Sequence, residues 1–325
     1  MTPTELPTLP HGSVLDIDIL REMYPTHGVS MSGIDPRLNA SQVARRLKIS
    51  RARVATRLRA WTEYGFLRRY DVWPNPYLFG CTGVSFDVRV EDRLRKSEVI
   101  DRVGLVHGAV GGFELAGEWI TATFVLPREE DAGRTATLLR GLAGVAEVSA
   151  ATPWATTETE RTLSPLELRI VRVLREHPTD SLAAVARHVG VSTRTITTRY
   201  GQLLDDLAVW FVPVFDFRAL AEPVVAATVQ FGAPQDRAHF VRSLRRTHPQ
   251  FLEFHRIQFG PALPETVGSY FLLGGSAARV EELEAWIRSS PGVVGLESYV
   301  MIRILSFPET FDRLLAEAAA RHGAR

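Results

Sequence analysis

Basic side chains are concentrated in one short segment of this 325-residue chain. Between residues 41 and 70, nine arginines and lysines occur with a single acid, Glu63. Arginine can bond the edge of guanine through two hydrogen bonds, and contacts to phosphate dominate the affinity of proteins for DNA. The chemistry that this segment predicts is therefore nucleic-acid recognition. The formal net charge of +1 conceals it, because the remaining residues carry an excess of acid.

Helical spacing of apolar residues places these basic side chains on two short helices. The positions that mark the buried sides of the two helices are Val43, Leu47, Val54, Leu58 and Trp61. A tight turn at residues 48–50 separates the helices, and Ser50 stands where a helix N-cap belongs. Two helices joined in this way form a helix-turn-helix, whose second helix enters the major groove of DNA.

The outward side of the second helix carries the residues expected to read bases. Opposite to its buried side lie two arginines, a threonine and two alanines: Arg53, Thr56, Arg59, Ala52 and Ala60. We expect Arg53, Thr56 and Arg59 to contact bases, and the other basic residues to hold phosphates or support the wing. The complete set of DNA-binding residues expected in this segment is Arg45, Arg46, Ser50, Arg51, Arg53, Thr56, Arg57, Arg59, Arg68 and Arg69.

The same pattern recurs 142 residues later, where Val43 to Ser50 matches Val185 to Ser192. The window that corresponds to 41–70, residues 183–212, holds only three arginines against two aspartates. The DNA-binding residues expected in the second helix-turn-helix are Arg194, Thr195 and Thr198. Because the electrostatic attraction is weak there, a protein-interaction role is the alternative for this second motif.

Each helix-turn-helix is followed by a strand-like run, at 66–72 and at 209–215, which we expect to form a wing. The remainder of each half alternates strands and helices in the order β-α-β-β-α-β, which is typical of a ferredoxin-like unit. The sequence thus predicts an α+β protein, a tandem duplication of a winged helix-turn-helix and a ferredoxin-like domain. The expected domains are residues 1–80, 81–153, 154–222 and 223–325, the last with a C-terminal helix.

Two segments connect the expected elements. Residues 152–164, rich in Thr and Glu, are the expected linker between the halves, and residues 24–39 are an insertion between the first two helices, expected as a surface loop. The equivalent link in the second half, residues 177–181, is short.

Several kinds of site and location are excluded or disfavoured by composition. Cys81 is the only cysteine, so no disulfide framework or Cys-rich zinc site is expected. The sequence lacks a P-loop, a G-x-S-x-G and an HExxH motif, and we expect no cofactor, no metal site and no enzymatic activity. It also lacks a long apolar stretch and a signal peptide, so we expect a cytoplasmic protein that does not enter a membrane.

The sequence resembles the Lrp/AsnC (feast/famine) transcriptional regulators. The matching segments are SQVARRLKIS at 41–50, Val54 with Arg57 and Leu58, and YGFLRRY at 64–70, which resembles the family's E-x-G-V-I-x-G-Y. The resemblance implies a winged helix joined to a β-α-β-β-α-β domain, double-stranded DNA as partner, and a small effector such as an amino acid held at the paired sheet domains. It also implies self-association, and two fused copies would pack their sheets face to face. The effector-binding residues stay unknown, because Trp119 replaces the acid of the family's Gly-x-x-Asp segment.

Two alternatives belong to other classes. Siroheme decarboxylases share this two-part architecture, and their chemistry calls for His and Arg side chains beside a tetrapyrrole carboxylate. The residues of the sheet domains that would serve are His107, His248, His255 and Arg256. A protein-interaction scaffold that does not bind DNA is the second alternative. The basic helix-turn-helix favours the regulator over both.

Overall fold

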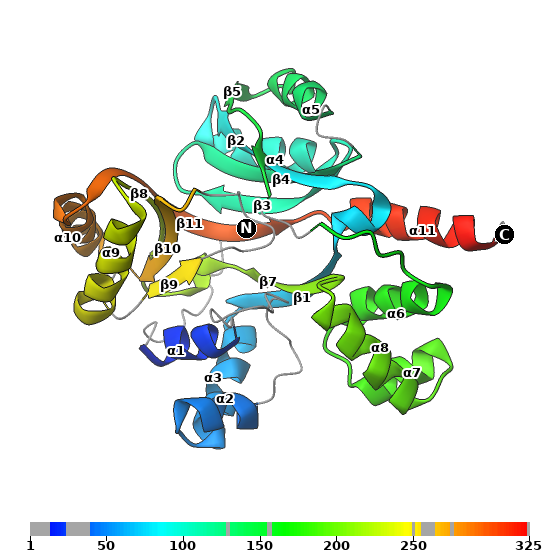
Figure 1. Ribbon diagram of the computed structural model, residues 1–325. Coiled ribbons are helices and arrows are strands. Elements are labelled where there is room, and N and C mark those ends of the chain that lie inside the picture. Colours follow the sequence, from blue (N-terminus) through cyan, green and yellow to red (C-terminus); the bar gives the residue numbers. More distant parts are fainter. Residues whose placement is uncertain are drawn as a thin grey trace, which may run out of the picture.

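A computed structural model shows the helices and strands on which these residues lie (Figure 1). The residues that the structure describes are 14–23, 40–127, 131–154, 158–248, 251–254, 264–273 and 276–323. The expected insertion at 24–39 lies outside them.

A unit of three helices comes first in each half of the chain. The first unit consists of α1 (Val14–Met23), α2 (Ala40–Leu47) and α3 (Arg51–Glu63), and the second of α6 (Pro165–Glu176), α7 (Leu182–Val189) and α8 (Thr193–Asp205). The side chains of Ser50 and Ser192 accept hydrogen bonds from backbone N–H groups in the first turns of α3 and α8, as the N-cap positions predicted. Val54 and Trp61 of α3 are fully buried, which fixes the side of this helix that faces inward.

The strand after each unit does not form a wing of its own. Strands β1 (Leu67–Pro74) and β7 (Val209–Phe215) pair antiparallel with each other, with Tyr70 opposite Pro213 and Asp71 opposite Val212. The expectation of two separate wings is therefore wrong. A strand that cannot bond within its own half finds its backbone partners in the other half.

The rest of each half forms a sheet covered by two helices. The first half contributes η1 (Pro76–Phe79), β2 (Thr82–Val90), η2 (Arg93–Arg95), α4 (Lys96–Gly104), β3 (Ala109–Leu115), β4 (Trp119–Leu126), α5 (Asp131–Arg140) and β5 (Val145–Val148). The second contributes η3 (Phe217–Ala219), β8 (Val224–Phe231), α9 (Pro234–Thr247), β9 (Phe251–Phe254), β10 (Val267–Leu273), α10 (Ala277–Ser289) and β11 (Val293–Ser306). The expected β-α-β-β-α-β order is present in both halves, and the α+β class is confirmed.

The two sheets join edge to edge rather than face to face. The strand order is β5-β2-β4-β3-β11-β8-β10-β9, so edge strand β3 of the first half pairs with β11 of the second. Strand β11 is long enough to pair with β8 through residues 293–301 and with β3 through residues 301–306. The expected face-to-face packing is therefore wrong. The sheets do not pack face to face because the first helical unit covers the apolar face of the joined sheet. Trp61 of that unit shares one core with Phe113, Phe271 and Tyr299 of the sheet.

The C-terminal helix and the expected linker make further contacts. Helix α11 (Glu309–Gly323) packs on α6 within the second half, and its Phe311 is buried in a cluster with Trp73 of the first half and Trp210 of the second. The expected linker at 152–164 is anchored in its described part, because β6 (Thr152–Pro153) pairs with β2 and the indole of Trp154 donates to Ser85 over 2.9 Å. The Phe311 cluster and the two shared strand pairs, β1–β7 and β3–β11, therefore tie the two halves together.

Candidate nucleic-acid interface

The side chains expected to read bases lie exposed along one side of α3. Ala52, Arg53, Thr56 and Arg59 are all exposed, whereas Ala60 is only partly so. The opposite side is held by the buried Val54 and Trp61, so the helix presents this surface to solvent because its other side belongs to the core.

Arg57 has a different environment, although it lies on the same helix. Its guanidinium donates to the carboxylate of Asp16 on α1, which also accepts a hydrogen bond from the indole of Trp61 over 2.8 Å. The side chains of Arg57 and Asp16 are 17% and 6% exposed, and the hydrogen bond to Asp16 raises the pKa of Arg57. The arginine therefore clamps α3 to α1.

The second unit contains a comparable pair. Arg199, which stands 142 residues after Arg57, lies 3.9 Å from the carboxylate of Glu167 on α6. Glu167 is buried, and Arg161 also pairs with it. An acid on the first helix and an arginine on the third thus hold each unit together, which supports a packing role for Arg57.

Three more of the expected DNA-binding arginines have acidic neighbours. Arg46 lies 3.7 Å from Glu22, Arg69 bonds Asp71 over 2.9 Å, and Arg68 bonds Asp216 over 2.9 Å. About half of each of these arginine side chains stays exposed. Burial opposes ionisation of Asp216, but its bonds to Arg218 and Arg68 outweigh that and lower its pKa.

The remaining cations of the segment are exposed and have no acidic partner among the described residues. They are Arg45, Lys48, Arg51, Arg53 and Arg59. Lys48 was counted in the charge of the segment but not among the expected DNA contacts. It lies in the turn between α2 and α3 and adds to the positive surface.

The equivalent surface of α8 is less basic. Arg194 and Thr198 are exposed, but the hydroxyl of Thr195 lies 2.8 Å from that of Ser192 at the start of the helix. Asp205 and Asp206 end the helix, and Asp206 pairs with Arg161. The charge difference between the two units, visible in the sequence, is thus present on their surfaces.

Both helical units lie on the same side of the β1–β7 ribbon, below it in Figure 1, and the large sheet lies on the other side.

The histidines named for the enzymatic alternative lie far apart where they are described. His107 is 3.3 Å from Arg313 on α11, and His248 packs against Trp286 on α10, where burial lowers its pKa. Helices α10 and α11 lie at opposite ends of the molecule (Figure 1). His255 and Arg256 lie outside the described residues. The two candidates that the structure describes, His107 and His248, therefore do not share one site.

The structure brings together three potential metal ligands that lie outside the sites expected from the sequence. His177, Asp180 and His188 meet at the link between α6 and α7. Their spacing, H-x2-D-x7-H across a short loop, was the signal available in the sequence.

Comparisons with known proteins give matches in structure alone. No family model and no curated protein matches the sequence. The siroheme decarboxylase NirDL matches over 96% of this chain and 100% of its own, with a TM-score of 0.50 and 16% identity. Escherichia coli AsnC matches 43% of this chain and 92% of its own (TM-score 0.32, 14% identity). A transcriptional regulator from Neisseria meningitidis, solved with L-Met, matches 43% and 89% (TM-score 0.32, 21% identity).

The expectation that the chain is not an enzyme is overturned by the full-length match. The architecture found over nearly the whole chain is also that of an enzyme, so the fold cannot exclude catalysis, since function resides in the site. None of the described helices is long and apolar enough to cross a membrane. What the comparisons show is the fold: a helix-turn-helix joined to a ferredoxin-like domain in an α+β protein.

Proposed function

We propose that the chain is a sequence-specific DNA-binding transcriptional regulator of the Lrp/AsnC type. The observation that carries the proposal is the outward side of α3, where Arg53, Thr56 and Arg59 are exposed without an acidic partner among the described residues. Arginine and threonine on the second helix of a helix-turn-helix are suited to base edges in the major groove.

The roles proposed for the other basic residues depend on whether an acidic side chain already pairs with them. Arg45, Lys48 and Arg51 flank the reading surface and are proposed to hold phosphates, with Ser50 beside them at the start of α3. Arg46, Arg68 and Arg69 are half-exposed and add longer-range attraction. Arg57 is assigned to packing, because Asp16 already holds it. The four-part division at 1–80, 81–153, 154–222 and 223–325 remains our proposal for the domains.

The second helix-turn-helix is proposed to bind DNA more weakly through Arg194, Thr195 and Thr198. With fewer unpaired cations, it contributes less to phosphate binding. The resemblance to the family further leads us to propose a small effector, such as an amino acid, at the sheet domains, and self-association through those domains. No residue is assigned to the effector.

Selection of bound duplexes from a random pool tests the proposal, and affinity measurements on the selected site test the residues. Arg53→Ala and Arg59→Ala are each expected to weaken binding by about 1–3 kcal/mol, since each removes a bidentate base contact. Arg194→Ala should cost less. Arg134→Ala, which removes an exposed arginine from α5 of the sheet domain, is the matched control and should leave affinity unchanged. Specific binding that survives both α3 substitutions would contradict the assignment.

A siroheme-decarboxylase-like activity is the second candidate, favoured by the full-length structural match. Incubation of the protein with siroheme followed by mass measurement tests it. Loss of carbon dioxide from the tetrapyrrole would support the enzyme, and an unchanged mass would remove this candidate.

A further inference from the structure

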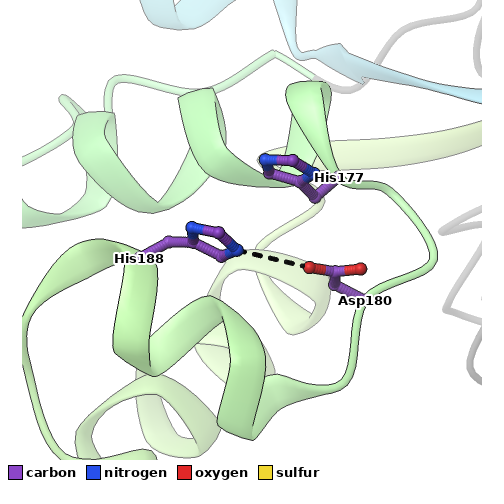
Figure 2. A group of neighbouring side chains, drawn as sticks. All are labelled: His177, Asp180 and His188. Atoms are coloured by element: carbon purple, nitrogen blue, oxygen red, sulfur yellow. Dashed lines mark ion pairs between the residues drawn. The ribbon is translucent and has the colours of Figure 1, made fainter.

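The link between α6 and α7 gathers two imidazoles and a carboxylate. His177 caps the C-terminal end of α6, Asp180 follows in the connecting loop, and His188 lies in the last turn of α7. Figure 2 shows the two rings lying one beside the other, with the Asp180 carboxylate directed at His188. Three side chains from two helices and a loop thus meet at one point.

The three side chains are close to one another, but the two rings are stacked. The ring centroids of His177 and His188 are 4.6 Å apart with the planes 10° from parallel, and Asp180 Oδ2 is 3.5 Å from His188 Nε2. One ligand atom from each residue can be chosen so that all three lie within 4.8 Å of one another. Tetrahedral ligands bound at about 2.0–2.1 Å stand roughly 3.4 Å apart. The ligand atoms must therefore approach by up to about 1.4 Å, and the stacked rings must turn so that one nitrogen of each faces the ion. Rotation of side chains at the surface can supply both changes.

The folding of the unit does not account for this cluster. His188 is exposed and His177 and Asp180 are partly exposed, while the core of the unit is built from other residues. The loop is already fixed by the Ser181 cap of α7 and by the bond from the Asp180 N–H to the His177 carbonyl. In the first unit, Arg46 stands 142 residues before His188, so the same motif forms there without a histidine at this position.

We propose that His177, Asp180 and His188 bind a divalent transition-metal ion of the Zn²⁺ type. Neutral imidazole and carboxylate are the ligands that Zn²⁺, Co²⁺ and Ni²⁺ take together in proteins, whereas Mg²⁺ and Ca²⁺ prefer oxygen alone. Three protein ligands leave at least one position for water. The ion ties the end of α6 to the end of α7 and so stabilises the second helix-turn-helix.

Titration of the tag-free full-length protein with Co²⁺ at neutral pH tests the site, because bound Co²⁺ gives visible absorption that depends on its ligands. We expect one ion per chain, displaced by Zn²⁺. The variants His177→Asn, Asp180→Asn and His188→Asn should each weaken binding at least about tenfold, the loss that follows even from removal of an outer-shell partner. His239→Asn changes an exposed histidine of α9 outside the cluster and should leave binding unchanged.

Hydrogen exchange on the unaltered protein provides a second test, which does not depend on whether the variants fold. With Zn²⁺ bound to the unaltered protein, backbone amides in residues 176–190 should exchange more slowly, and Tm should rise by a few degrees. Protection at other histidines, or Co²⁺ affinity unchanged in all three variants, would overturn the proposal. So would an absence of Co²⁺ and Zn²⁺ binding by the unaltered protein.

Discussion

Lys48 holds a backbone conformation that L-residues with a side chain rarely adopt. Its φ is +54°, in the left-handed region, and Gly190 occupies the equivalent turn of the second unit with a φ of +76°. Left-handed backbone costs a non-glycine residue about 1–2 kcal/mol. The turn of the first helix-turn-helix thus keeps a strained lysine where the second has glycine, and this lysine adds to the proposed DNA-binding surface.

Lys48→Gly is therefore expected to stabilise the protein. Relief of the strain exceeds the roughly 0.4–1 kcal/mol by which glycine favours the unfolded chain, so a net gain of about 0.5–1 kcal/mol follows. The reverse change, Gly190→Lys, should destabilise by a similar amount, because a Cβ at Gly190 meets no atom within 4 Å and only the backbone strain remains. Urea unfolding of both variants measures the two effects. Equal signs for the two substitutions would refute the strain argument.

At the residue scale, the sequence predicted the outward side of α3 but not the pairing of its arginines. Spacing alone separates Arg53 and Arg59 from the buried Val54, because helix periodicity is local. The acid that engages Arg57 is Asp16, 41 residues away, and the acid that engages Arg68 is Asp216, 148 residues away. Such pairs are set by tertiary packing, which no local pattern records.

At the scale of elements, helix α6 begins with a capping box. The Ser164 side chain accepts from the Glu167 N–H, and the Glu167 carboxylate accepts from the Ser164 N–H. Burial opposes ionisation of Glu167, but its hydrogen bonds from Ser164 and its contact with Arg161 prevail and lower its pKa. The charged carboxylate thus fixes the first turn of the helix that opens the second unit.

Stability should consequently fall in acid through Glu167. An unfolded glutamate takes up its proton near pH 4.3, before the folded one, so the stabilisation is complete above that pH and is lost as the pH falls through the lower folded pKa. The gap in urea midpoint between the unaltered protein and Glu167→Gln should therefore narrow from pH 7 to pH 3. Glu282→Gln, which changes an exposed side chain of α10, serves as control. A gap that stays constant with pH would contradict the prediction.

Strand β3 joins the two sheets by pairing with β11, and Gly112 lies in the paired segment. Gly112 lies between β4 and β11, and a Cβ there would stand 1.9 Å from the carbonyl oxygen of Thr121, at a φ of +149°. Gly112→Ala should therefore destabilise by roughly 2–4 kcal/mol. Gly133→Ala in α5, where a Cβ meets nothing within 4 Å, should instead stabilise by about 0.5–1 kcal/mol. Thermal unfolding compares them, and a Gly112→Ala protein as stable as the parent would disprove the close approach.

The order of helices and strands was predictable, whereas the partners of edge strands were not. The sequence predicts strands at the positions of β3 and β11, but it does not say which edge each one meets. It also does not say what covers the apolar face. Phe113 and Phe271 could equally have met a second sheet, and the structure shows that they meet the core of the first helix-turn-helix.

For the molecule as a whole, the halves are interdependent because each completes the other. The stacked rings of Phe66 and Phe215, with centroids 4.5 Å apart, bring β7 into the core of the first helical unit. Val72 of β1 in turn lies in the core of the second unit, and Trp73 of β1 packs in one cluster with Phe311 of α11. Neither half can bury these apolar side chains alone, and each would expose unpaired strand edges at β1 or β7 and at β3 or β11.

Separate expression of residues 1–154 and 155–325 should therefore yield halves that aggregate or fail to fold, whereas co-expression should yield a one-to-one complex. A tag on one half, co-purification of the other and a single cooperative unfolding transition are the measurements. The substitution Phe215→Ala separates the contribution of the shared core from that of the covalent link between the halves. It truncates a buried ring that packs in the core of the other half, and should weaken the reassembled complex by about 3–5 kcal/mol. Either half unfolding cooperatively by itself would mean that the strand pairs β1–β7 and β3–β11 are dispensable, and that the molecule is two domains in contact rather than one structure built by both halves.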